Sequence, residues 1–454
     1  MLSLGLRIES LIFYLFILLL PTQICKHFWP PFSQVLGVRV DYLSPALYIT
    51  DLLVLILFIF WIKRKIFNLV IPARPSVIPA PLFVIPAKAG IPSSHQNTKT
   101  KTLLSLLIIF PYLLFTILLS GHLFPGLYQL VKVIELFFLG FYIAERVKTK
   151  NELSLIIMIA SIGVIGESLL AIAQYIHQSS LNGLFYFLGE RRFTSSTPGI
   201  ANASINGQLI LRPYATFPHP NALAGYLLCM LIMIFLVSDN KKDNIKKIIK
   251  TLALLLGQIA LLLTLSRTAI LLWMILLSSV LVVKIKNSTK KKLPVALTAL
   301  LVLILVFSFL AYTPALTRLE ETTLTEQAFT QRIDLTKNAL TLIAVHPLFG
   351  VGLGNYLPAV AVIQKPLSTL YIQPVHNIFL LLLSEIGIIG LLSVLAFLFK
   401  TYQRLKNPPT NNIKKILLIV LSVILILGLF DHYWLTLQQN QLLLTVILGL
   451  SWAL

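Results

Sequence analysis

Long apolar runs recur along almost the whole chain and constrain its fold more than any other feature. They have the length of about 20 residues that a helix needs to cross the hydrocarbon core of a membrane. The chain is 57% hydrophobic and only 12% charged, whereas soluble domains contain about 25% charged residues. We therefore predict an all-α, polytopic integral membrane protein with about 12 transmembrane helices.

The apolar windows also define the domain organisation. Spans are expected at 10–25, 46–62, 103–119, 125–143, 153–177, 222–237, 249–265, 268–283, 293–312, 377–399, 416–431 and 435–453. They divide the chain into two N-terminal helices (1–69), a Pro-rich insert (70–101), a central group of helices (102–312) with an outer loop at 178–221, a large outer loop (313–376) and a last group of helices (377–454).

The basic residues are distributed unevenly between the two sides. With the N-terminus inside, most of the 37 lysines and arginines fall in segments on the inner side. Because positive charge accumulates on the cytoplasmic side of membrane proteins, both termini are expected in the cytoplasm and the long loops outside. The net charge of +21 is then mainly a topology signal, so we expect membrane lipids and no nucleic acid as partners.

A short repeat marks the insert at 70–101. Val-Ile-Pro-Ala recurs at Val70, Val77 and Val84, and a polar stretch follows. Proline lacks a backbone N–H and is not tolerated inside a regular spanning helix. We predict a low-complexity cytoplasmic segment, with a functional linker as the alternative.

The large outer loop contains one amphipathic pattern. Leu335, Ala339 and Leu342 fall on one helical face with Ile343, and polar residues such as Lys337 lie largely opposite. This pattern is typical of a helix that lies on a membrane surface. We therefore expect an amphipathic helix on the outer face of the membrane.

Two arginines lie where outer segments meet apolar runs. Arg212 ends the loop at 178–221, and its guanidinium has the planar fork that matches phosphate oxygens; contact with lipid headgroups is the alternative. Arg267 stands between two apolar runs with almost no loop, where a charge is costly unless it reaches the interface or finds a partner. We predict a phosphate clamp at Arg212 and a functional role for Arg267.

Most of the eight histidines fall at or near the predicted outer side. His376 begins an apolar helix after the largest outer loop, and a neutral imidazole accepts a proton near physiological pH. His219 and His346 each adjoin proline, which also fits a structural turn, and Asp41 is a further carboxylate in the first outer loop. The histidines form no HxxxH or HxH pair, so the sequence gives no support for a metal site.

Gly350, Gly352 and Gly354 mimic a dinucleotide-binding loop. No βαβ unit follows them, and their expected side is away from cytosolic nucleotides. Glycine also permits backbone conformations that other residues avoid. We therefore predict a tight re-entrant turn, and no cofactor.

Four stretches together resemble the O-antigen ligase/polymerase family of bacterial envelope glycosyltransferases. They are His376-Asn377 followed by Gly387 and Gly390, Arg267 through Leu271, Thr216 through Asn221, and His346 through Asn355. The resemblance covers residues 150–450, approximately, and the expected plan of spans. The Pro-rich insert departs from the family pattern, but it is expected on the opposite side.

The resemblance implies a GT-C-like, metal-independent, inverting transferase that uses an undecaprenyl-diphosphate-linked glycan. Departure of a diphosphate without a metal requires fixed positive charge, which Arg212 and Arg267 would supply. His376 would act as the base for the acceptor hydroxyl. The remaining residues of the expected site, assigned to substrate binding, are His219, Asn221, His346, Asn355, Asn377 and Glu385.

The expected location is the bacterial inner membrane, with the active site facing the periplasm or exterior. The acceptor is a glycan, a lipid or a protein, so ligation, polymerisation and protein O-glycosylation all remain open. A transporter of envelope glycolipids also has many spans, but it would show matched halves and polar or broken helices near the midplane. A non-catalytic scaffold would not need arginines at the membrane edge. The sequence does not determine the oligomeric state.

Overall fold

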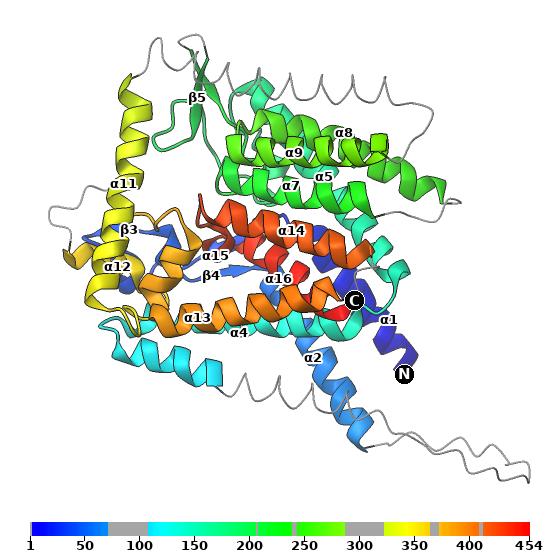
Figure 1. Cartoon of the computed structure of the whole chain (residues 1–454), viewed down its shortest axis with the longest axis horizontal. Helices are drawn as coiled ribbons and strands as arrows, with labels where there is room; N and C mark the ends of the chain where they lie inside the picture. Colours follow the sequence, from blue (N-terminus) through cyan, green and yellow to red (C-terminus); the bar gives the residue numbers. More distant parts are fainter. Residues whose placement is uncertain are drawn as a thin grey trace, which may run out of the picture.

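A computed structural model describes residues 2–70, 108–205, 208–237, 243–286, 322–363, 372–407 and 412–454. These residues are predominantly helical, which confirms the all-α class (Figure 1). The expected span at 293–312 and the Pro-rich insert after its first residue lie outside the described residues.

Every other expected span coincides with a helix. The helices are α1 (Leu2–Leu19), α2 (Ile49–Val70), an unlabelled helix Ile108–Leu119, α4 (Leu123–Arg146), α5 (Lys150–His177), α7 (Pro220–Leu236), α8 (Asn244–Leu263), α9 (Arg267–Lys286), α13 (Ile378–Lys406), α14 (Asn412–Gly428) and α16 (Gln438–Ala453). Within the described part of the chain, α4, α5 and α13 are long and apolar enough to cross a membrane, and Ile108–Leu119, Pro220–Leu236 and Arg267–Val283 are shorter apolar helices. A membrane protein is thus supported, while the full number of spans stays a prediction.

The remaining elements lie in the connections between these helices, and all of them except α11 are short. The helical ones are η1 (Pro31–Ser33), η2 (Asp41–Leu43), α6 (Leu184–Phe187), α11 (Thr322–Val345), α12 (Tyr356–Ile363) and α15 (Tyr433–Thr436). Among the described residues, three antiparallel pairs of strands join β1 (Cys25–His27) to β4 (Ala46–Tyr48), β2 (Gln34–Val35) to β3 (Val38–Arg39), and β5 (Asn202–Ile205) to β6 (Gln208–Leu211). The sequence analysis did not predict these small hairpins, because such short strands carry no detectable alternation of apolar and polar residues.

Helix α7 forms the centre of the largest apolar core. Its sequence is apolar on all sides, and nearly all of its residues are buried, including Cys229. A helix without a polar face has to be surrounded by other elements, and α5, α8, α14 and α16 pack around it. Gly225 allows α7 to approach α15 closely. The Cβ atom of any other residue at this position would lie only 2.6 Å from the Tyr433 hydroxyl oxygen. This contact sets the distance between two elements of the site described below.

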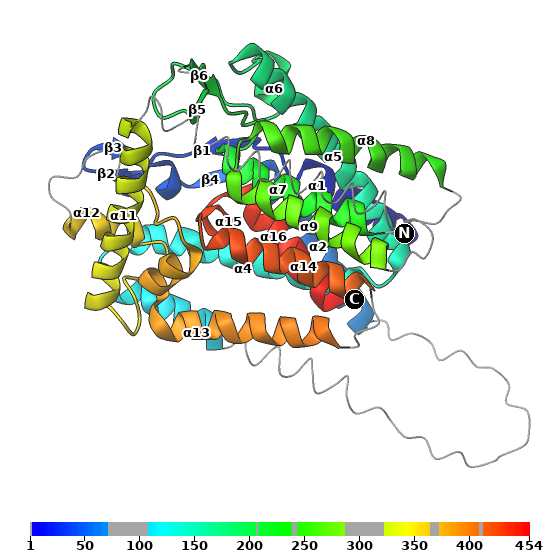
Figure 2. The same ribbon diagram turned by 45° about the horizontal axis from the view of Figure 1, so that its top comes forward.

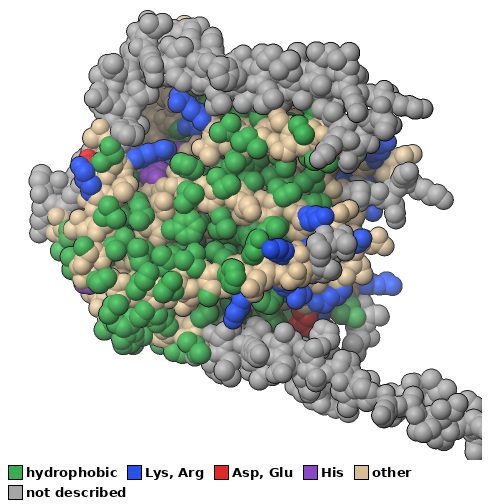
Figure 3. All heavy atoms as spheres, viewed as in Figure 1, with side chains coloured by type: hydrophobic (Ala, Val, Ile, Leu, Met, Phe, Trp, Pro, Cys, Tyr) green, Lys and Arg blue, Asp and Glu red, His purple; other side chains and the backbone are tan. Residues whose placement is uncertain are grey.

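The two ends of the helical bundle differ in chemistry. Both termini lie at one end, and α11 crosses the other (Figures 1 and 2). Lysine and arginine side chains gather near the end with the termini, whereas a histidine is visible beside basic side chains near α11 (Figure 3). This arrangement agrees with the expectation that both termini share one side, but it does not assign that side to the cytoplasm.

The predicted amphipathic helix is present as α11, but its apolar face does not lie on a membrane. Leu335, Ala339 and Leu342 are buried, and Ala339 and Leu342 pack in one cluster with Val40 and Val375. The prediction of its membrane-facing surface was wrong, because an apolar helical face has the same pattern whether it packs on lipid or on protein. Helix α11 is therefore packed against the other elements at this end of the bundle.

The predicted tight turn is confirmed. Gly350, Gly352 and Gly354 all have positive φ angles, of 69°, 96° and 71°. The turn packs into a kink of α13 at Gly387. A residue other than glycine would not fit there, because its Cβ atom would lie 2.2 Å from the Leu348 carbonyl oxygen. Backbone N–H groups of the turn donate to carbonyl groups that the kink leaves unpaired, such as Gly352 N to Glu385 O at 2.9 Å. The turn thus holds the start of α13, where the site lies.

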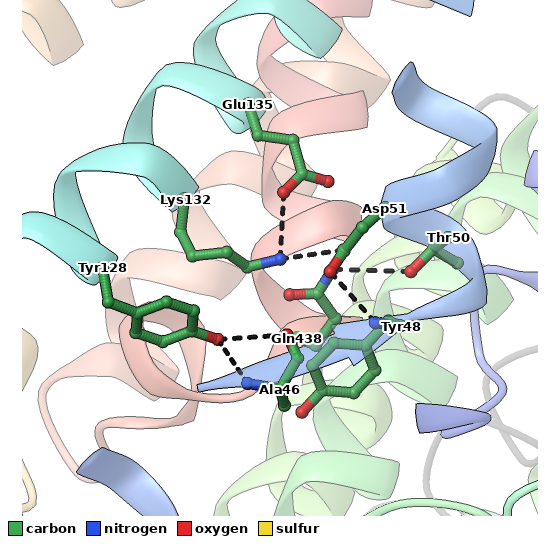
Figure 4. Close-up of polar contacts among 8 residues, drawn as sticks. All are labelled: Ala46, Tyr48, Thr50, Asp51, Tyr128, Lys132, Glu135 and Gln438. Atoms are coloured by element: carbon green, nitrogen blue, oxygen red, sulfur yellow. Dashed lines mark hydrogen bonds and ion pairs between the residues drawn. The ribbon is translucent and has the colours of Figure 1, made fainter. Parts of the chain in front are cut away.

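Buried charges between α2, α4 and α16 are paired (Figure 4). Lys132 Nζ lies 2.8 Å from Asp51 Oδ1 and 2.9 Å from Glu135 Oε2. Gln438 Nε2 donates to Asp51 Oδ1 over 2.6 Å, and the Tyr48 backbone N–H donates to Asp51 Oδ2 over 3.0 Å. Through these contacts the cluster joins the N-terminal and C-terminal parts of the bundle.

Candidate functional site

The centre of the candidate site is a group of His376, Asp431 and His432. One nitrogen of each histidine and a carboxylate oxygen all lie within 4.8 Å of one another. The two imidazole rings are 5.1 Å apart between centroids and are inclined at 70°. His376 lies just before α13, while Asp431 and His432 form the turn between α14 and α15. Residues far apart in the sequence thus form one buried polar centre.

The turn between α14 and α15 fixes the position of two of these residues. Asp431 Oδ1 accepts a hydrogen bond from the backbone N–H of His432 at 2.8 Å. His432 Nδ1 lies 2.7 Å from Thr436 Oγ1, which is one helical turn later. Both side chains are almost fully buried, with exposed fractions of 8% for Asp431 and 4% for His432. Burial and local hydrogen bonds therefore hold them in one arrangement.

Asn221 connects this centre to Arg212. Its Nδ2 donates to Asp431 Oδ2 over 3.0 Å, and its Oδ1 accepts from Arg212 Nη2 over 2.6 Å. Arg212 also donates through Nε to the Thr264 carbonyl oxygen at 2.8 Å. His219, the N-cap of α7, accepts the Asn221 backbone N–H on Nδ1 at 3.1 Å. The structure thus brings four predicted site residues together: Arg212, His219, Asn221 and His376.

Two further arginines contribute positive charge to the same region. Arg267 begins α9 directly after the turn that contains Thr264, and Arg332 lies on α11. The charges of both lower the pKa of Arg212, and the charge of Arg332 also lowers the pKa of His376. Both side chains are exposed. Three guanidinium groups from three separate elements therefore act on one centre, which is suited to an anionic group.

Burial sets the protonation states in the centre. It lowers the pKa of His376 below its ordinary value, that of His432 to about 4 and that of His219 to about 3. Burial alone would raise the pKa of Asp431, but the three histidines and the Asn221 hydrogen bond lower it overall. Burial lowers the pKa of Arg212 only to about 10. Near neutral pH the centre therefore contains neutral imidazoles, an ionised carboxylate and charged arginines.

His376 has the nitrogen best suited to accept a proton. Among the described residues, its Nδ1 is buried and has no hydrogen-bond partner. Neutral imidazole nitrogen is a general base, and an adjacent carboxylate stabilises the imidazolium that forms. The pair His376 and Asp431 thus has the parts of a base and its electrostatic support.

The other predicted residues lie in the framework around this centre. Asn377 caps α13 by accepting the backbone N–H groups of Phe379 and Leu380. The Glu385 carboxylate accepts hydrogen bonds from backbone N–H groups of the glycine turn. Asn355 is buried and donates to Ser120 Oγ at 3.2 Å, and His346 is exposed at the end of α11. Their predicted contacts with substrate stay predictions.

Sequence analysis did not single out Asp431, His432 or Arg332. Asp431 and His432 form a polar pair in a short turn between two apolar runs, which is the signal that identified Arg267. A charge between two apolar runs is costly without a partner, and this argument would also have identified Asp431 and His432. Arg332 was one of several charges on a long outer helix, and only the fold separates it from its neighbours.

A family model described as O-Antigen ligase matches residues 251–395. This match covers less than half of the chain and supports its assignment to the O-antigen ligase/polymerase family. None of the curated proteins matches the chain. The range matched by the O-antigen ligase model includes Arg267, Arg332 and His376, whereas Arg212 and Asp431 lie outside it. The similarity to this family supports an enzyme with a glycan-transfer role at a membrane.

The centre also contains possible metal ligands, which the histidine spacing did not suggest. His376, Asp431 and His432 are residue types that bind zinc and related ions. Both carboxylate oxygens of Asp431, however, already accept hydrogen bonds from Asn221 and the His432 backbone. A metal bound here would share the Asp431 oxygens with these two hydrogen bonds, whereas His376 Nδ1 has no hydrogen-bond partner among the described residues.

Proposed function

We propose that this protein transfers a glycan from an undecaprenyl-diphosphate carrier to an acceptor hydroxyl or amide, as an O-antigen ligase does. The observation that carries the proposal is the hydrogen-bonded connection from Arg212 through Asn221 to Asp431, beside His376. It places a fixed positive charge and a neutral base at one centre. These are the two requirements of a displacement in which a diphosphate leaves and a hydroxyl attacks.

The proposed reaction is a single displacement at the anomeric carbon. His376 Nδ1 takes the proton of the acceptor hydroxyl while its oxygen forms a bond to that carbon. The bond between the carbon and the phosphate oxygen breaks, and its electron pair leaves with the diphosphate. Attack from the face opposite the leaving group inverts the configuration. Each bond change is thus matched to a group in the centre.

The arginines stabilise the charge that develops on the leaving diphosphate. Arg212 is held by two hydrogen bonds before any substrate binds, so little reorganisation is needed. Arg267 and Arg332 are exposed, and each guanidinium has the fork that forms paired hydrogen bonds to phosphate oxygens. Positive charge from three guanidinium groups supports a metal-independent reaction.

The orientation in the membrane is part of the proposal. We place the end of the bundle with α11 and the site on the periplasmic side of the inner membrane, and both termini in the cytoplasm. After replacement of Cys25 and Cys229 by serine, a cysteine at Ser196 should react with an impermeant reagent in spheroplasts. A cysteine at Gln403 should react only after lysis. The reverse pattern would overturn the orientation.

The test of function uses purified protein in nanodiscs with an undecaprenyl-diphosphate oligosaccharide as donor and rough lipopolysaccharide as acceptor. His376→Ala should bind the donor normally and reduce transfer by roughly 10²–10⁴-fold, as expected for loss of a general base. Arg267→Ala should weaken donor binding, and Arg267→Lys should restore it only partly, because an ammonium lacks the fork. Normal transfer by a folded His376→Ala protein would contradict the proposed base.

A further inference from the structure

The segment between α1 and α2 carries an aromatic residue next to the site that has no role in the mechanism above. Tyr42 belongs to η2, and its side chain is 38% exposed. Its ring centroid lies 5.5 Å from that of His432, with the two planes at 82°. The His432 ring in turn contacts the ring of His376. Tyr42 is therefore one residue removed from the proposed base.

The backbone around Tyr42 is fixed although its side chain is exposed. Val40 and Leu43 on either side are buried in the apolar cluster that also contains Val375, the neighbour of His376. Ser44 Oγ lies 2.6 Å from His27 Nδ1, which ties the end of η2 to β1. A tyrosine ring held on a rigid backbone can bind a ligand at a low cost in conformational entropy, through its apolar face and its hydroxyl.

The charges around Tyr42 differ from those around Arg212. Asp41, Asp431 and Arg191 act on the Tyr42 hydroxyl, whereas Arg267, Arg332 and Asp431 act on Arg212. Asp431 is the one charged group common to both. Tyr42 thus shares only Asp431 with the charged neighbours of Arg212, and we assign the acceptor to the Tyr42 side of the two histidine rings.

We propose that Tyr42 binds the sugar ring of the acceptor by stacking and so presents its hydroxyl to His376. A sugar ring has an apolar face of C–H groups and a polar rim, and tyrosine offers an apolar ring with a hydroxyl at its tip. This inference rests on the proposed transferase function. It adds a specificity-determining residue from the N-terminal part of the chain, which lies outside the range matched by the family model.

The kinetic test measures KM for rough lipopolysaccharide and for the lipid-linked donor separately. Tyr42→Ala should raise the KM for the acceptor by roughly fivefold to tenfold, the size of an aromatic contact, and leave the donor KM and kcat within about twofold. Tyr42→Phe should retain most of the affinity because it keeps the ring. Phe28→Ala is the matched control, since Phe28 is 46% exposed on the same segment. An unchanged acceptor KM, or a raised donor KM instead, would overturn the proposal.

A binding measurement separates this inference from the proposed function. Binding of delipidated core oligosaccharide is measured to His376→Ala protein and to the double variant with Tyr42→Ala, both checked for folding by thermal unfolding. The double variant should bind more weakly by the same roughly fivefold to tenfold. That result would support the sugar contact even if no variant transferred a glycan. Equal binding by the two proteins, or no binding by either, would contradict it.

Discussion

Asn221 donates a hydrogen bond to Asp431 over 3.0 Å, although the two residues are 210 positions apart. The same side chain accepts a hydrogen bond from Arg212. One amide thus fixes the separation between the proposed diphosphate-binding charge and the carboxylate beside the proposed base. An amide side chain meets both demands of this position, because it donates to the carboxylate through its nitrogen and accepts from the guanidinium on its oxygen.

The first prediction concerns this amide. Asn221→Ala leaves Arg212 and Asp431 without their common partner, and a buried polar group without a hydrogen bond costs about 1–3 kcal/mol. We expect a lower midpoint of thermal unfolding and a reduced kcat for transfer. Asn221→Asp should lower the unfolding midpoint and kcat further, because a second carboxylate would face Asp431. Asn202→Ala is the control, since Asn202 donates to Ser195 O in the same outer loop; an equal loss there would contradict the specific role of Asn221.

The second prediction uses two charges that act on His376 in opposite directions. Asp431 raises the pKa of His376 and Arg332 lowers it, while burial keeps it below its ordinary value. The acidic limb of the pH profile of kcat/KM reports this pKa in the free enzyme. Asp431→Asn should therefore move the limb to lower pH, and Arg332→Gln should move it to higher pH. Shifts of the same sign in both variants would exclude His376 as the titrating base.

The sequence predicted some residues of the candidate site but not the contacts between them. Arg212, Arg267 and His376 were predicted because each stands where a polar segment meets an apolar run, and a charge there needs a reason. The partner of Arg212 was not predictable, because the contact from Asn221 to Asp431 depends on the packing of α7 against α14 and α15. The apolar face of α11 was recognised, but its pattern does not distinguish protein from lipid.

The third prediction concerns the buried cluster of Lys132, Asp51 and Glu135. Lys132→Met would leave two carboxylates without their cation, and breaking a buried ion pair in this way costs about 3–5 kcal/mol. We expect a large fall in the midpoint of thermal unfolding in detergent. Adding Asp51→Asn and Glu135→Gln to Lys132→Met should recover much of that loss, because no uncompensated charge remains. A triple variant as unstable as the single one would show that the charges themselves are required.

The fourth prediction concerns metal dependence. His376, Asp431 and His432 are metal ligands by type and proximity, yet in the proposed mechanism three arginines supply the positive charge that a departing diphosphate needs. We therefore expect full transfer after dialysis against EDTA, and no stimulation by Zn²⁺, Mg²⁺ or Mn²⁺.

The His432→Gln variant would distinguish the arginine-based mechanism from a metal-dependent one. If a metal were essential, this variant should lose transfer and regain part of it at high metal concentration. If His432 only packs against His376 and Tyr42, glycan transfer by the His432→Gln variant should not change when metal is added. Loss of activity in EDTA with recovery on addition of one metal would overturn the arginine-based mechanism, and it would reassign His376 from a base to a ligand.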